Sequence, residues 1–254
     1  MMMHFAQICA RVRCPKQIAL VLVPAFVLVL VLAGAAAAAQ EAAFTVNQRG
    51  QQVGTASYRL KPSKDGIEST ALVHVSMQGL NYALSKNEEL TAAHQFAHVQ
   101  LSAIVNDSAV TVTGTVEGQK LALEIAANGR SKTTLMDGHA GAVFMPDFDP
   151  GALETLLTLG AAANNRDLWA IIPRQAGTID PVTLATYPDE EGTLDGKPIA
   201  VHHLVATIAG ATTHLFSGPD NQLLQAELPQ EGFALVLNGF VLKPPAKPIT
   251  PAEQ

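Results

Sequence analysis

The sequence predicts a mainly β protein, a curved antiparallel sheet of half-barrel-like meander form with one amphipathic helix packed on it. Three observations predict this fold class. Short apolar runs between Phe44 and Phe240 are separated by Gly, Asn and Asp residues, which is typical of an antiparallel meander. Apolar and polar residues alternate within these runs, so one face of each strand is expected to be buried. A single stretch near residues 150–163 instead repeats leucines at helical spacing.

The first half of the expected sheet contains the clearest alternation. Val110, Val112 and Val116 face one way, with threonines between them, and the next run repeats this pattern with Leu121 and Leu123. Because a hairpin places consecutive strands side by side, the two apolar faces should join. Strands are expected at 53–60, 67–77, 96–105, 110–116 and 121–127. Turns are expected at Lys64-Asp65-Gly66, Asn106-Asp107, Glu117-Gly118 and Asn128-Gly129.

The helix has a clear start signal. Asp149 is a favourable N-cap residue, and Pro150 suits the first helical position because its missing N–H is not needed there. Leu153, Leu156 and Leu157 then form an apolar stripe that should lie on the sheet. The spacing predicts a helix from about Pro150 to residue 163.

The second half of the chain again shows strand and turn signals. Strands are expected at 168–173, 183–187, 199–208, 212–216, 222–228 and 233–237. The β-rich domain should therefore span residues 40–242. Residues 243–254 contain four prolines, and we expect them to form a disordered or polyproline tail.

Residues 1–39 have the three parts of a signal peptide. A positive region with Arg11, Arg13 and Lys16 precedes an apolar run, and small residues follow it. We expect cleavage between Ala39 and Gln40, which predicts an exported, periplasmic or secreted protein. The alternative is an inner-membrane anchor formed by residues 18–39, because about 20 apolar residues can span a bilayer.

Composition narrows the function classes. Removal of residues 1–39 would leave 215 residues, without either cysteine, carrying 13 basic and 22 acidic side chains, a net charge of −9. A domain without cysteine has no disulfide, thiol nucleophile or thiolate metal ligand. Nucleic-acid binding requires clustered positive charge, which this chain lacks, so nucleic acid is excluded as a partner.

Several polar groups are candidates for metal binding or catalysis. His94 and His98 are four residues apart, as zinc ligands on a helix often are, but the segment leads into a strand pattern. His202 and His203 lie within one strand, so their rings should point to opposite faces. The acidic stretches at 147–149 and 189–191 could attract calcium, although neither has the spacing of an EF-hand loop. There is no Gly-x-Ser-x-Gly motif, and the sequence indicates no metal, cofactor or catalytic residue.

The order of segments resembles a known architecture. It comprises Phe44-Thr45-Val46, the turn before Val53-Gly54-Thr55, the central helix, a strand with Trp169, and the late run Leu194-Asp195-Gly196-Lys197-Pro198-Ile199. This order resembles uncharacterised bacterial secreted domains with a helix in the hollow of a curved sheet. Their architecture is similar to that of the periplasmic carriers and outer-membrane receptors of the lipoprotein-localisation system. The resemblance implies a half-barrel that could hold an apolar ligand, and it carries over no catalytic residue.

These observations favour a non-enzymatic exported domain that binds an apolar small molecule or an envelope protein. Trp169 is expected either to anchor the core or to form an aromatic wall of the ligand hollow, with Phe96, Met145 and Phe148 as the further lining residues. One alternative is an envelope hydrolase, which would need a nucleophile and a hydrogen-bonded base in one cleft. The other is a purely structural or protein-interaction domain. Contact with a membrane is expected only through the N-terminal segment, if it stays uncleaved.

Overall fold

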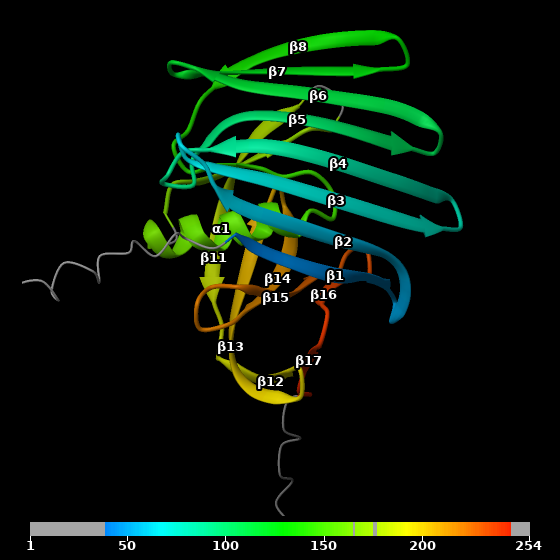
Figure 1. Ribbon diagram of the computed structural model, residues 1–254, viewed down its shortest axis with the longest axis vertical. Coiled ribbons are helices and arrows are strands. Elements are labelled where there is room, and N and C mark those ends of the chain that lie inside the picture. The colour runs from blue at the N-terminus through cyan, green and yellow to red at the C-terminus, as the bar shows by residue number, and fades with distance from the viewer. Residues whose placement is uncertain (1–38, 165, 175–176, 245–254) are drawn as a thin grey trace, which may run out of the picture. The chain divides into compact units, whose positions relative to one another are not determined.

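An extensive antiparallel β-sheet dominates the part of the chain that the structure, a computed structural model, describes: residues 39–164, 166–174 and 177–244 (Figure 1). The strands are β1 (Gln40–Gln48), β2 (Gln51–Pro62), β3 (Ile67–Met77), β4 (Leu80–Leu90), β5 (Phe96–Val105), β6 (Ser108–Glu117), β7 (Lys120–Ala127), β8 (Arg130–Asp137), β9 (Ala142–Phe144), β10 (Leu168–Ile172), β11 (Thr178–Thr186), β12 (Glu190–Leu194), β13 (Lys197–Ile208), β14 (Ala211–Ser217), β15 (Leu223–Leu228), β16 (Phe233–Leu237) and β17 (Phe240–Leu242). The mainly β, antiparallel fold class predicted from the sequence is confirmed.

The strands form one long ladder with a short branch. Strands β1 to β8 follow one another as an antiparallel meander. On its other side β1 pairs with β16, and the ladder continues through β15, β14, β13 and β11 to β10. Strand β9 joins β10 in parallel, and β12 pairs with both β13 and β17.

The sheet curves strongly enough to bring β9 against β5. These strands contact each other although they are far apart along the ladder. Phe96 of β5 and Phe144 of β9 stack with their ring centroids 6.2 Å apart, and both are buried. The concave side of the sheet therefore encloses the hydrophobic core.

Tight turns connect many strands, as the sequence predicts. Both central residues of Asn106-Asp107, Asn128-Gly129 and Asp195-Gly196 have positive φ. Turns of this kind match the right-handed twist of the strands they join, and Asn, Asp and Gly tolerate their backbone conformation best. These local signals fix the hairpins of the meander.

Helix α1 (Pro150–Ala162) lies inside the curve of the sheet. It contacts β2 and β3 on one side and β9, β10 and β15 on another (Figure 1). Asp149 caps it, and Pro150 occupies its first turn, so the predicted start is confirmed. Burial extends beyond the leucine stripe to Glu154 and Thr155, because neighbouring strands cover more than one side of the helix.

Two long strands were not predicted from the sequence. In β4 the inward positions after Leu84 are Lys86 and Glu88, so charged residues break the apolar alternation even though both are buried. In β8 most residues are exposed, and Leu135 is 65% exposed, so no apolar face marks the strand. Both omissions arise because alternation reveals only strands with one consistently apolar face.

The predicted signal peptide, except Ala39, lies outside the described residues, as does the predicted tail beyond Pro244. Ala39 precedes β1 and is exposed, as is Gln40 at the start of this strand. Within residues 39–244, leaving out 165 and 175–176, no helix has the length and hydropathy needed to cross a membrane.

Candidate functional site

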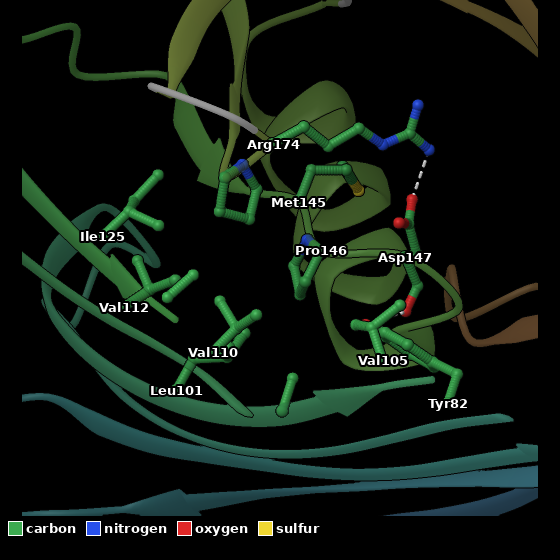
Figure 2. A pocket seen from close by; sticks show the side chains of 13 residues that line it. Tyr82, Leu101, Val105, Val110, Val112, Ile125, Met145, Pro146, Asp147 and Arg174 are labelled. Carbon is green, nitrogen blue, oxygen red and sulfur yellow. Dashed lines mark hydrogen bonds and ion pairs between the residues drawn. The ribbon is translucent and has the colours of Figure 1, made fainter. Parts of the chain in front are cut away.

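A hollow of about 280 Å³ lies where strands β4 to β7 face the segment between β9 and α1 (Figure 2). We call it the first hollow. Its lining residues are Tyr82, Leu101, Ala103, Val105, Val110, Val112, Ile125, Ala127, Met145, Pro146, Asp147, Pro173 and Arg174. Most of these side chains are apolar, so the hollow suits the hydrocarbon part of a ligand.

Strand register builds the floor of the first hollow. Val112 of β6 pairs directly with Leu101 of β5 and with Ile125 of β7. Val110 pairs in the same way with Ala103 and with an alanine of β7. Directly paired residues point to the same face of a sheet, so two rows of aliphatic side chains cross three strands side by side. The period-two alternation seen in the sequence therefore produces a continuous apolar surface.

A second hollow of about 400 Å³ adjoins the first. The two share Tyr82, Val105, Met145, Pro146, Asp147 and Arg174 as lining residues. The remaining lining residues of the second hollow are Leu80, Phe148, Asp149, Leu153, Ile172, Ile208, Ala209, Ala211, Thr213, Leu228, Glu231, Phe233 and Leu235. Because they share these residues, the two hollows lie next to each other along the Met145–Asp147 segment.

An ion pair between Arg174 and Asp147 lies on the shared wall (Figure 2). Both side chains reach solvent, with 67% and 42% of their surfaces exposed. The hydrogen bond and charge of Asp147, together with the charge of Glu231, raise the pKa of Arg174. The Tyr82 hydroxyl donates to the backbone carbonyl of Asp147 at 3.4 Å. Burial, with the charges of Asp147 and Asp149, raises the pKa of Tyr82, so its hydroxyl stays protonated.

Phe148 has a strained backbone and lines the second hollow. Its φ of 58° lies in the left-handed region, which a bulky side chain rarely adopts. Its ring packs edge-on against Tyr82 and Phe233, with centroid distances of 5.9 and 4.8 Å. Backbone strain of this kind persists where the surrounding structure holds it, and it is common at binding sites.

A buried charge cluster holds the segment next to Phe148. The ammonium of Lys86 lies 2.6 Å from Oε2 of Glu88 and 2.6 Å from Oδ2 of Asp149, and all three side chains are almost fully buried. Burial opposes the charge on Lys86, but the two carboxylates outweigh it and raise its pKa. Burial also raises the pKa of Glu88, against the opposing effect of Lys86.

Asp149 connects this cluster to the helix. Its Oδ1 accepts hydrogen bonds from the backbone N–H groups of Gly151 and Ala152, while its Oδ2 faces Lys86. The helix start and strand β4 are therefore joined through one carboxylate, which fixes the wall of the second hollow.

The four residues expected to line a ligand hollow occupy three different places. Met145 lines both hollows, and Phe148 lines the second. Phe96 packs in the core against Phe144, outside both lining sets. Trp169 on β10 is half-buried and stacks on His139, with ring centroids 3.7 Å apart, also outside both lining sets.

The histidines considered as zinc ligands have separate surroundings. His94 lies in the turn before β5 with a φ of 59°, so the helical spacing that suggested a shared face does not apply. His98 lies on β5, and its Nδ1 is 2.9 Å from the hydroxyl of Thr115. Neither histidine lines either of the two hollows, so neither hollow provides the cleft that the hydrolase alternative would need around them.

The acidic stretches considered as calcium ligands pair with basic side chains of the protein. The pairs are Asp147 with Arg174, Asp149 with Lys86, Asp189 with His202, Glu190 with His203, and Glu191 with Lys243. The different partners of His202 and His203 agree with their predicted positions on opposite faces of β13. Among the described residues, no three or more His, Cys, Asp or Glu side chains are grouped so that they could hold a metal ion.

Sequence reasoning missed most of the lining residues. Val110 and Val112 were predicted to lie on an apolar strand face, whereas for Leu101 and Ala103 only the strand at 96–105 was predicted. Nothing in the sequence distinguishes a residue facing a hollow from one facing the core. Arg174 lies 27 residues from Asp147, and only the fold brings them together.

The chain matches no protein-family model and no curated protein. Among solved structures it is similar to a β-barrel-like protein of the domain of unknown function DUF1849 from Brucella abortus. That similarity has a TM-score of 0.52 at 10% sequence identity and covers 80% of this chain and 97% of that chain. A DUF1089 family protein from Pseudomonas aeruginosa aligns with a TM-score of 0.38 and 10% identity over 76% of this chain and 90% of that chain. At this identity the first similarity shows a β-barrel-like fold alone.

Proposed function

We propose that this protein is an exported binding protein that holds the apolar part of a small molecule in the first hollow. The observation that carries the proposal is the pair of aliphatic rows across β5, β6 and β7, which face a hollow of about 280 Å³. Ligand sites are typically concave and apolar, with a few polar groups at defined positions. Arg174 and Asp147 supply those polar groups at the edge of the hollow.

The ligand class follows from the lining. Aliphatic walls without a buried charge favour an alkyl or acyl chain, because each methylene group moved out of water contributes about 0.8 kcal/mol. The polar end of such a molecule would lie near Arg174 and Asp147, where both side chains contact solvent. A lipoprotein-carrier-like role in the periplasm is consistent with this proposal, and it also rests on the predicted signal peptide.

A chain-length series tests the proposal. Fluorescent alkyl probes with 8, 10, 12 and 14 carbons are titrated into the purified protein. Each added pair of methylene groups should tighten binding roughly tenfold until the hollow is full, after which the affinity should level off. Weak binding that does not depend on chain length would contradict the proposal.

Two neighbouring residues of β5 provide matched variants. Ala103 lines the first hollow, whereas Ile104 points to the other face and is 49% exposed. Ala103→Trp should fill the hollow and weaken the 12-carbon probe at least about tenfold, since the lost contact area includes several methylene groups. Ile104→Trp should leave the affinity unchanged. If Ala103→Trp fails to fold, Val112→Ala tests the same claim, because a wider hollow should move the plateau to a longer chain.

A further inference from the structure

One face of β13 and β14 carries two histidines in direct contact. Nε2 of His203 lies 3.0 Å from Nδ1 of His214. His203 pairs across the ladder with Phe216, and His214 lies two residues before Phe216, so both rings extend from the same face. Neither residue lines a hollow, so this pair belongs to a different part of the protein.

The ring of His203 is held in a fixed orientation. It stacks on Phe216 with a centroid distance of 4.5 Å and an interplanar angle of 21°. Tyr187 contacts it as well, at a centroid distance of 5.1 Å. A histidine that is positioned by its neighbours loses little freedom when it binds a ligand.

Glu190 determines which nitrogen of His203 is available. Its Oε1 lies 3.2 Å from Nδ1 of His203, so Nδ1 carries the proton and donates to the carboxylate. Nε2 then has a lone pair directed toward His214. Histidines that bind metals usually have a carboxylate or carbonyl in this position, which fixes the tautomer and raises the basicity of the ligating nitrogen.

The spacing of the two nitrogens also suits a metal ion. Metal–nitrogen bonds of about 2.0–2.1 Å place two ligands on one ion about 2.9 Å apart at a right angle and about 3.3 Å apart in a tetrahedron. The observed 3.0 Å lies within that range. Glu227 pairs directly with His214 across β14 and β15, so a second carboxylate adds negative charge near the pair.

We propose that His203 and His214 bind one divalent transition-metal ion, such as Zn²⁺ or Cu²⁺, through Nε2 of His203 and Nδ1 of His214. His214 takes part after its ring proton moves to Nε2. In the described part of the chain the ion has two protein nitrogens, and solvent or an external ligand completes its coordination. An open site of this kind is suited to exchangeable rather than structural metal.

Titration with Zn²⁺, followed by NMR of the histidine ring nitrogens in the purified protein, tests the proposal. Nε2 of His203 and Nδ1 of His214 should both shift on addition of one equivalent. Unchanged ring nitrogens in His203 and His214 would overturn the proposal, because a nitrogen that coordinates the ion must shift when the ion binds. This readout uses the unsubstituted protein, so it does not depend on whether a variant folds.

Equilibrium dialysis of variants with Zn²⁺ is a second, independent test of the proposal. His203→Ala and His214→Gln should each weaken Zn²⁺ binding at least about tenfold, and Glu190→Gln about 10–100-fold, as for other residues that orient a metal ligand. His202→Ala is the matched control, because His202 is adjacent in sequence and also pairs with a carboxylate, Asp189. The Zn²⁺ affinity of His202→Ala should stay within about twofold of that of the unsubstituted protein. An equal loss in His202→Ala and His203→Ala would contradict the assignment.

Discussion

Nζ of Lys86 lies 2.6 Å from Oδ2 of Asp149, so a strand in the middle of the meander holds the carboxylate that caps the single helix of the described chain. Both groups are buried, and Glu88 is the third member of the cluster. An ion pair in this environment stabilises the fold only while all partners are present, because removal of one leaves the others uncompensated. The cluster therefore ties the start of the helix to β4 at the wall of the second hollow.

Removal of the Lys86 charge should strongly destabilise the protein. Lys86→Met keeps the length of the side chain but leaves Glu88 and Asp149 without a counter-charge, which should lower the free energy of unfolding by about 3–5 kcal/mol. Urea denaturation measures this change. Lys61→Met is the control, because Lys61 is exposed and 4.0 Å from Glu68, a pair worth about 1 kcal/mol or less. Similar losses in both variants would contradict a structural role for the buried cluster.

Asp149 should contribute to the free energy of unfolding in two separable ways, as the helix cap and as the partner of Lys86. Asp149→Asn retains an oxygen that can accept the N–H groups of Gly151 and Ala152 but removes the charge that faces Lys86. Asp149→Ala removes both. The alanine variant should be less stable than the asparagine variant by about 1 kcal/mol, the usual contribution of an N-cap. Thermal and urea unfolding compare them, and equal stability of the two variants would show that the cap contributes nothing.

Stability should depend on pH through Glu154. Burial raises the pKa of this carboxyl, against the opposing hydrogen bonds from the Leu223 N–H and from Gln40 and Tyr58. A carboxyl whose pKa is raised on folding stabilises the fold below its unfolded pKa, and this contribution is lost as the pH rises through the folded value. Glu154→Gln should therefore become more stable relative to the unsubstituted protein as the pH increases from about 4.5. If the difference in unfolding free energy between Glu154→Gln and the unsubstituted protein stays constant from pH 4 to pH 8, this assignment is contradicted. Glu41→Gln, at an exposed position, is the control.

Position 148 should favour glycine over alanine. Phe148→Gly and Phe148→Ala both lose the ring contacts with Tyr82 and Phe233, but only glycine adopts a φ of 58° without steric cost. The glycine variant should be more stable by about 1 kcal/mol, since left-handed backbone costs other residues about 1–2 kcal/mol. Urea unfolding of the two variants measures the difference. A more stable alanine variant would mean that the backbone at Phe148 relaxes once the ring is removed.

Local signals in the sequence predicted much of the fold. Asn128-Gly129 predicted a hairpin, and Asp149-Pro150 predicted the helix start, because each depends on residues that are close in the chain. Strand β4 was missed because Lys86 and Glu88 occupy its buried face, and the partner that makes this possible, Asp149, lies about sixty residues away.

The candidate site was harder to predict because it depends on long-range packing. The pairing of β1 with β16 joins residues almost two hundred positions apart. The period of apolar residues in the sequence does not predict which distant strands will pair. Apolar residues were recognisable as buried, but Phe96 packs against Phe144 whereas Met145 lines both hollows. The curvature of the sheet decides which apolar residues pack in the core and which face a hollow.

The central claim is that the first hollow holds an alkyl chain, and intermolecular NOEs between a 12-carbon probe and methyl-labelled protein test it most directly. The methyl groups of Val110, Val112 and Ile125 line the hollow, whereas Ile104 lies on the other face and provides an internal reference. The proposal predicts NOEs from the probe to the three lining residues and none to Ile104. NOEs confined to exposed residues, or none at saturating probe, would contradict it.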